Sequence, residues 1–89
     1  MPNIRIPTPL RAYAGGQSQV DVSGNNVGLA LNDLTQSFPE LRKHLFDGDQ
    51  LRSFVNIYLN QEDIRYLEGD ETPLQENDTL LIVPSIAGG

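Results

Sequence analysis

The 89-residue sequence contains no cysteine, no tryptophan and a single histidine. The absence of cysteine excludes disulfide bonds, thiolate metal sites and thiol nucleophiles, and it prevents the chain from holding sulfur as a persulfide. No apolar stretch approaches the roughly 20 residues that a membrane-spanning helix needs. The first residues also lack the apolar segment of a signal peptide. We therefore expect one small cytoplasmic domain that works away from membranes.

Basic residues are also scarce. Six Lys and Arg residues stand against twelve Asp and Glu residues, which gives a formal charge of −6 at pH 7. Nucleic-acid binding needs a basic face for the phosphates, so this charge argues against a nucleic-acid partner. A basic protein partner is favoured instead, because complementary charges accelerate association. The single histidine, His44, follows Arg42 and Lys43 and indicates a surface residue rather than a catalytic one.

The first half of the chain predicts a β-hairpin followed by one main helix. Alternating side chains predict one strand from Asn3 toward Leu10 and a second over residues 19–23. The paired glycines Gly15 and Gly16 predict a turn over residues 14–17 between the two strands. Asn26 is placed to cap a helix. The apolar face of that helix has the expected three- and four-residue spacing and comprises Val27, Ala30, Leu31, Leu34 and Phe38.

The middle of the chain predicts a short helix and a strand. Pro39 ends the main helix, since proline removes a backbone donor, and residues 40–46 predict a second, short helix. The alternation over residues 54–59 predicts a strand in which Phe54 and Tyr58 share one face.

The last third predicts a short strand and then a buried central strand. Residues 60–63 turn the chain into a short strand through Ile64 and Tyr66, which an acidic loop follows. The apolar run over residues 79–83 is typical of a strand covered on both sides. Pro84 ends that strand because proline has no N–H to donate. We expect the last strand to pair in parallel with the first.

The last strand presents two different faces. Leu80 and Ile82 are expected to face the helix, and the alternate residues are left on the open face of the sheet. An exposed apolar group of that kind is typical of a docking surface, with ordinary packing beneath a loop as the alternative. The predicted partner-docking residues are Leu81, Val83, Phe54 and Tyr58.

Beyond the last strand the chain consists of small residues and ends in Gly88-Gly89. Glycine has no Cβ, so such an end fits a channel too narrow for other residues. Five residues from Ser85, at roughly 3.3 Å each when extended, reach about 17 Å. We predict a domain over residues 1–84 and a flexible tail over residues 85–89 that carries a carboxylate into another protein's active site. An inert glycine-rich tail is the alternative.

Several blocks of residues, in register with the Gly-Gly end, carry a resemblance over essentially the whole chain. They are Ile6-Pro7-Thr8, Leu10-Arg11, Gly15-Gly16-Gln17, Phe54-Val55-Asn56-Ile57-Tyr58, Asn60, Glu62-Asp63, Arg65, Pro84 and Ala87-Gly88-Gly89. Together with the element order, these blocks resemble those of proteins with the β-grasp, ubiquitin-like fold. This fold belongs to the α+β class and consists of a mixed sheet with one main helix packed on it. More specifically, the chain resembles the bacterial sulfur-carrier family of the molybdopterin synthase small subunit and the thiamine sulfur carrier. Within that family it is most similar to the cysteine-biosynthesis carriers of actinobacteria.

The resemblance implies a chemistry at the end of the tail. A ubiquitin-activating-like adenylyltransferase and sulfurtransferase would use ATP to adenylate Gly89, and sulfur would then displace the adenylate to form a thiocarboxylate. Gly88 and Ala87 would let the tail reach into each active site. A pyridoxal-phosphate-dependent cysteine synthase would receive the sulfur, and a metalloprotease would release the product. The chain itself would be a monomer, with no bound cofactor, metal site or catalytic residue.

Two further functions stay open on the sequence. The carrier could deliver sulfur to molybdopterin, or the chain could be a ubiquitin-like modifier joined through Gly89 to lysines of other proteins. Lys43 is the only lysine, so lysine-linked chains would have a single branch point. The family often places an aromatic residue beside the tail, whereas Leu81 and Val83 are aliphatic, which leaves the partner open.

Overall fold

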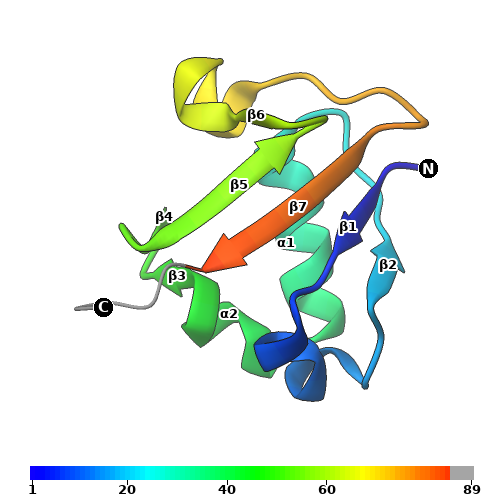
Figure 1. Cartoon of the computed structure of the whole chain (residues 1–89), viewed down its shortest axis with the longest axis vertical. Helices are drawn as coiled ribbons and strands as arrows, with labels where there is room; N and C mark the ends of the chain where they lie inside the picture. Colours follow the sequence, from blue (N-terminus) through cyan, green and yellow to red (C-terminus); the bar gives the residue numbers. More distant parts are fainter. Residues whose placement is uncertain (85–89) are drawn as a thin grey trace.

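The computed structural model describes residues 1–84, and the predicted tail lies outside the described residues. A five-stranded mixed sheet forms one layer and the helices form the other (Figure 1). The strands of the sheet are β1 (Asn3–Arg5), β2 (Gln19–Asp21), β5 (Val55–Leu59), β6 (Glu62–Asp63) and β7 (Thr79–Pro84). Their order across the sheet is β2-β1-β7-β5-β6.

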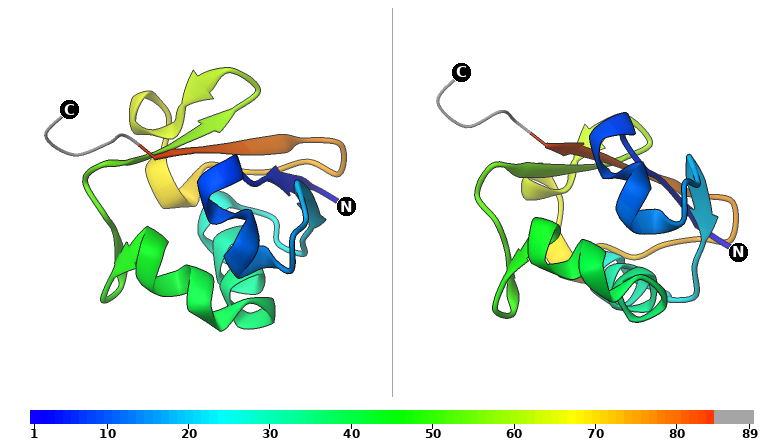
Figure 2. Two further views of the ribbon diagram at one scale, coloured as in Figure 1. Left: turned by 60° about the horizontal axis from the view of Figure 1, so that its bottom comes forward. Right: turned by 90° about the horizontal axis from the view of Figure 1, so that it is seen from below.

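Besides the sheet, the described residues form two α-helices and several shorter elements. These are α1 (Val27–Ser37), α2 (Pro39–Leu45), the 3-10 helices η1 (Thr8–Ala14), η2 (Ile64–Tyr66) and η3 (Gly69–Glu71), and the small hairpin β3 (Phe46–Asp47) and β4 (Gln50–Leu51). Figure 2 shows α1 and α2 on the same side of the sheet, so the opposite face of the sheet stays open. No helix within residues 1–84 is both long enough and apolar enough to cross a membrane.

The first strand is shorter than the sequence predicts. β1 pairs with β2 as expected, but the predicted continuation of the strand toward Leu10 is wrong, because η1 begins just after Pro7. Proline has no N–H for a sheet ladder, and a 3-10 helix tolerates it in its first turn. The Arg11 Nε donates to the Ile6 carbonyl at 3.0 Å, which fixes η1 against the end of β1. Gly15, at a φ of 64°, ends η1 and confirms the predicted glycine turn.

The main helix follows its sequence signals closely. The Asn26 side chain accepts a hydrogen bond from the Leu29 N–H at 2.8 Å and so caps α1. Phe38 ends the helix and Pro39 begins α2, where a missing N–H costs no intrahelical bond. The predicted apolar face is confirmed. Its fully buried members are Val27, Ala30, Leu31 and Leu34, and Phe38 packs against the core from a partly buried position.

A tight hairpin joins β5 to β6. Asn60 and Gln61 have φ angles of 49° and 79°, and two successive positive values define the two-residue turn whose twist suits a hairpin. The predicted strand through Ile64 and Tyr66 is wrong, because those residues form η2. The Asp63 carboxylate accepts the backbone N–H of Arg65 at 2.8 Å, and this cap turns the chain into a helical turn.

The last strand is central, as predicted. β7 pairs in parallel with β1 on one side and antiparallel with β5 on the other. Leu80 and Ile82 face α1 and are 0% and 1% exposed. Pro84 pairs with Val55 and still belongs to β7, which therefore includes one residue more than the predicted strand. The other large core side chains with under 2% exposure are Ile4, Ile6, Leu31, Leu34, Leu41, Leu45, Ile57, Val22, Val27 and Val55.

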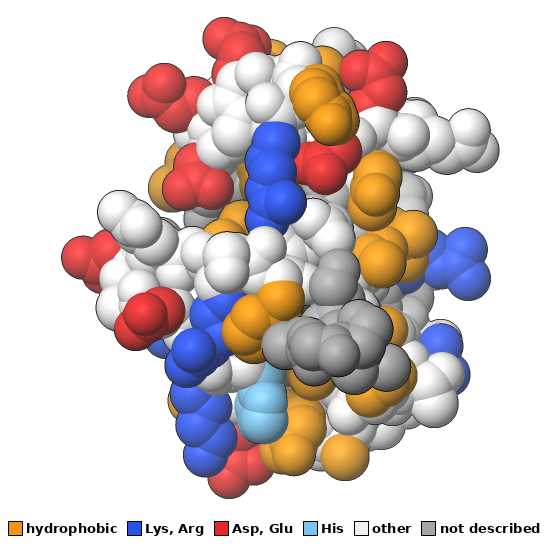
Figure 3. Space-filling model, turned by 60° about the vertical axis from the view of Figure 1, so that its left-hand side comes forward, with side chains coloured by type: hydrophobic (Ala, Val, Ile, Leu, Met, Phe, Trp, Pro, Cys, Tyr) orange, Lys and Arg blue, Asp and Glu red, His pale blue; other side chains and the backbone are white. Residues whose placement is uncertain are grey.

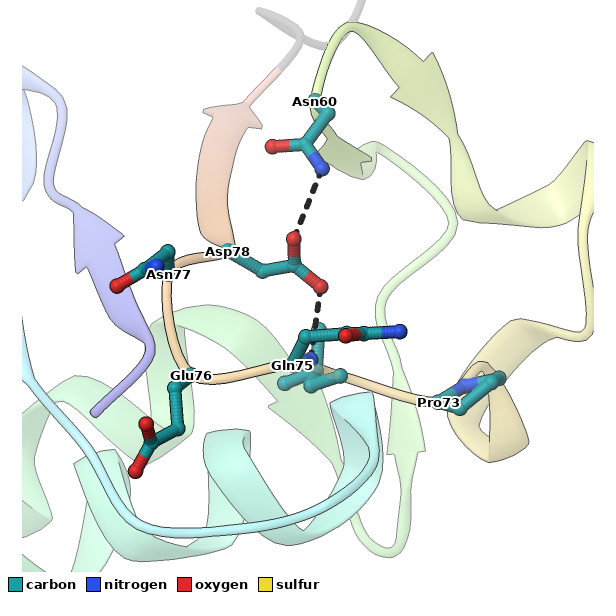
Figure 4. Close-up of a pocket in the computed structure, with 7 residues that line it drawn as sticks. Asn60, Pro73, Gln75, Glu76, Asn77 and Asp78 are labelled. Atoms are coloured by element: carbon teal, nitrogen blue, oxygen red, sulfur yellow. Dashed lines mark hydrogen bonds between the residues drawn. The ribbon is translucent and has the colours of Figure 1, made fainter.

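A carboxylate fixes the loop in front of β7. The Asp78 side chain accepts hydrogen bonds from the Asn60 side-chain amide at 3.0 Å and from the Gln75 backbone N–H at 2.8 Å. Figure 4 shows both donors directed at the two carboxylate oxygens, while the neighbouring Glu76 points away from them. The loop before β7 is thereby tied to the β5–β6 hairpin.

We expect Asp78→Ala to lower the free energy of unfolding by about 1–2 kcal/mol, because two charge-assisted hydrogen bonds are lost. Urea unfolding followed by circular dichroism measures this change. Glu76→Ala is the matched control, since it removes the same charge from the same loop and should change stability by under about 0.5 kcal/mol. Equal losses in the two variants would contradict a role for these two bonds.

Candidate functional site

The open face of the sheet is built by strand alternation. Ile4 on β1, Leu80 and Ile82 on β7, and Ile57 on β5 point to the helices and are buried. The residues between them therefore point the other way. The register places Arg5 of β1 and Tyr58 of β5 on either side of Leu81, so the three side chains form one row across the middle of the sheet.

A shallow hollow of ≈ 510 Å³ lies on this row. Leu81 is 40% exposed, and Tyr58 and Val83 are partly exposed. The residues that line the hollow are Arg5, Tyr58, Asn60, Gln61, Thr79, Leu81 and Val83. An apolar floor with a polar rim is the usual composition of a protein-docking surface. We call this group the open-face hollow.

Three of the four residues predicted for docking lie in the open-face hollow, and Phe54 does not. Phe54 precedes β5 in a turn that the Val55 N–H closes by donating to the Arg52 carbonyl at 3.0 Å. β5 therefore begins one residue later than predicted, although burial still alternates from the exposed Phe54 through Tyr58. Phe54 is 37% exposed and lines a separate hollow beside Leu51 of β4.

The residues predicted for the chemistry, Gly89, Gly88 and Ala87, lie outside the described residues. The last described residue is Pro84, three positions before Ala87. Pro84 ends β7 at the edge of the open face, one residue after Val83, which faces the hollow. A partner that covers the open-face hollow would therefore contact the chain directly before its last five residues.

Arg65 fixes the start of β5, the strand that pairs with the end of β7. Arg65 donates through Nη2 to the carbonyls of Ser53 and Val55, both at 3.0 Å, and through Nη1 to the Asn56 side-chain oxygen at 2.8 Å. Val55 and Asn56 pair with Pro84 and Val83 at the end of β7. The short strand β6 does not pair with this part of β5, and the planar guanidinium instead donates to the two carbonyls. Arg65 thereby fixes the start of β5, which in turn pairs with the end of β7.

The charges are unevenly distributed over the surface. Seven of the twelve acidic residues lie between residues 62 and 78, whereas Arg42, Lys43 and Arg52 line one hollow near α2 and β3. Figure 3 shows acidic side chains gathered toward the top of one face and a column of basic side chains lower down. The protein therefore presents a charge gradient to an approaching partner in addition to its net charge.

The single histidine packs against an aromatic ring of η1. His44 is half-buried, and its ring stacks on that of Tyr13 in η1, with centroids 4.1 Å apart. The neighbouring Arg42 lies 4.6 Å from the centre of the Phe46 ring and pairs with Asp49 at 3.8 Å. These contacts join α2 to η1 and to the β3–β4 hairpin, which explains the local clustering of aromatic and charged residues.

Solved structures identify the class of protein that this fold represents. A chain in the crystal structure of the Amycolatopsis orientalis BexX/CysO complex matches it with a TM-score of 0.91 and 34% identity, over 100% of both chains. The small archaeal modifier protein 1 of Methanosarcina acetivorans matches with a TM-score of 0.89 and 34% identity, over 99% of this chain and 95% of that one. The fold is the β-grasp of ubiquitin-like proteins, and the predicted fold class is confirmed.

Sequence comparison then identifies the family. The sequence profile of the ThiS family matches residues 4–89. Sulfur carrier protein CysO of Mycobacterium tuberculosis is 38% identical over 89 residues, which cover 97% of this chain and 96% of that protein. The chain belongs to the ThiS family and is a homologue of sulfur carrier proteins, so the predicted resemblance is confirmed.

The structure adds roles that sequence reasoning missed. Arg65 and Asn60 appear among the residues that carry the resemblance, yet only the structure shows the bonds of Arg65 to β5 and of Asn60 to Asp78. The place of Arg5 in the open-face hollow was also missed. The sequence did contain a signal for this position. Side chains alternate along a strand, so the neighbour of the core residue Ile4 must face the open side, as Leu81 does.

We expect Arg65→Lys to lower the free energy of unfolding by about 1–2 kcal/mol, because an ammonium cannot reproduce the fork of three hydrogen bonds. Amide hydrogen exchange should accelerate in Val55, Asn56 and Val83 more than in the buried residues of α1. Arg5→Lys is the control and should leave both measurements unchanged. Uniform acceleration over the whole chain would show that Arg65 does not act locally.

Proposed function

We propose that the protein is a sulfur carrier whose Gly89 is adenylated and then converted to a thiocarboxylate that donates sulfur for cysteine biosynthesis. The observation that carries this proposal is the extent of the family match, which runs through residue 89. The Gly-Gly end therefore belongs to the homologous region and is not an unrelated appendage. The similarity to CysO over 97% of the chain supports cysteine as the product.

The chemistry assigns separate tasks to the carrier and to its enzymes. A carboxylate is a poor electrophile, so the activating enzyme uses ATP to form a carboxyl adenylate on Gly89 and releases pyrophosphate. A sulfur nucleophile then attacks the carbonyl carbon, AMP leaves, and the thiocarboxylate remains. The chain has no cysteine to compete for the sulfur. ATP is bound by the enzyme, and the carrier contributes the reacting carboxylate and the docking surface.

Partner proteins follow from this sequence of reactions. They are the ubiquitin-activating-like adenylyltransferase and sulfurtransferase, a pyridoxal-phosphate-dependent cysteine synthase as sulfur acceptor, and a metalloprotease that releases cysteine from the carrier. Each must accommodate the end of the chain, so each is expected to cover the open-face hollow beside Pro84. The BexX/CysO complex of a structural relative supports docking as the mode of action.

A protein modifier is the second candidate function. The observation that favours it is the 34% identity and TM-score of 0.89 to an archaeal small modifier protein. In that role Gly89 would form an isopeptide bond with a lysine of another protein. Both functions begin with the same adenylate, and they differ in the nucleophile that displaces it.

Incubation with the activating enzyme, ATP and a sulfur donor is expected to raise the intact mass by about 16 Da, because sulfur replaces one carboxylate oxygen. Deletion of Gly89 should abolish this gain. The same deletion should change the free energy of unfolding by under about 0.5 kcal/mol, since the buried core ends at Ile82. Intact-protein mass spectrometry and urea unfolding provide the two measurements.

An unchanged mass with an enzyme that consumes ATP in response to the chain would exclude the thiocarboxylate. Formation of heavier products that retain the chain on lysines of other proteins would favour the modifier function. Val83 and Pro84 remain in place in the Gly89 deletion, so a large loss of stability would contradict the separation of the domain from its last residues.

Leu81→Asn is expected to raise the KM of the activating enzyme for the carrier at least about tenfold, because an exposed apolar contact at the centre of the docking face is replaced by an amide. The value of kcat should change little. Leu29→Asn is the matched control, since Leu29 is 49% exposed on α1 and lies away from the open face. Similar KM values for the two variants would place the docking surface elsewhere.

A further inference from the structure

One arginine differs from all others in the chain. Each of the other four arginines donates a side-chain hydrogen bond to an acceptor of the protein. They are Arg11, Arg42, Arg52 and Arg65. Arg5 forms no hydrogen bond and no ion pair with any residue of the described chain. Its guanidinium therefore has five donors available to a partner.

Arg5 lies where a docking partner would contact it. Its side chain lines the open-face hollow, and its register partner on β7 is Leu81, with Tyr58 beyond it. On the other side, the neighbour on β2 is the uncharged Gln19. A single cation thus lies beside the apolar floor of the hollow, on a protein whose net charge is −6.

We propose that Arg5 is a specificity-determining residue of the docking face, and that the activating enzyme presents a carboxylate side chain to it. This inference rests on the proposed function, in which that enzyme covers the open-face hollow. Docking removes water from Arg5, and a buried cation without an acceptor is strongly unfavourable. A partner with an Asp or Glu opposite Arg5 restores the lost interactions through a bidentate pair, whereas a purely apolar partner surface is rejected.

The local and global charges make different demands on the partner. The acidic surface as a whole attracts a basic partner over long range. Arg5 requires an acidic group at short range, at the centre of the contact. A partner that satisfies both has a carboxylate surrounded by basic residues, and this pattern fixes the orientation in which the carrier docks.

The test is ATP–pyrophosphate exchange by the activating enzyme from the same source, measured against the concentration of the full-length chain. Arg5→Gln should raise KM about tenfold and Arg5→Glu more, with kcat nearly unchanged, because the pair acts in binding. Arg5→Lys should recover part of the affinity. Lys43→Glu is the matched control: it makes the same charge change as Arg5→Glu at an exposed position on α2, and its KM should stay within about twofold of the wild type.

Salt provides a second measurement with the same proteins. Raising sodium chloride from about 50 to about 300 mM should increase the KM of the wild type more than that of Arg5→Gln, since only the wild type retains the ion pair. Equal KM values for Arg5→Glu and Lys43→Glu, with wild-type exchange intact, would overturn the assignment of Arg5 alone. If the wild type supports no exchange, the proposed function fails and this inference fails with it.

Discussion

The double pairing of β7 is the constraint on which the rest of the structure depends. Hydrogen bonds to β1 on one side and β5 on the other place this strand at the centre of the sheet. Its two-residue period then divides its side chains between the core and the open face. Leu80 and Ile82 are buried in the core, while Leu81 and Val83 line the open-face hollow. One strand therefore supplies the core with one set of alternate residues and the proposed docking surface with the other.

Sequence reasoning succeeded where a pattern repeats over many residues. The helix α1 and the strand β7 have long apolar patterns, and a single misleading residue does not change their period. The turns at Gly15 and Asn60 were also predictable, since few residues adopt positive φ. The predictions failed over the short segments that became η1 and η2. These segments are held by local backbone bonds together with side-chain bonds from Arg11 and to Asp63, and no periodicity in the sequence reveals such bonds.

The candidate site shows the same division. Tyr58, Leu81 and Val83 were placed correctly because alternation along β5 and β7 fixes their common face. Phe54 lies outside the open-face hollow because β5 begins one residue later than predicted, after a turn that a backbone hydrogen bond closes. Arg5 was not predicted as a site residue, because its proposed role depends on which side chains lie next to it in the folded sheet. The composition gives the net charge of the chain, and only the register of β1 with β7 shows one cation next to an apolar hollow.

A sulfur carrier must leave each partner after it has docked, and the size of the site agrees with that requirement. A stable complex commonly buries about 800 Å² on each partner, which is roughly a seventh of the 5445 Å² surface of this protein. The exposed apolar floor of the open-face hollow is contributed by only three side chains of β5 and β7. Three side chains provide a small apolar centre, so a charged contact beside it would add orientation to the proposed complex. In the proposed complex, an isolated arginine beside that centre would supply orientation without the large apolar area that slows release.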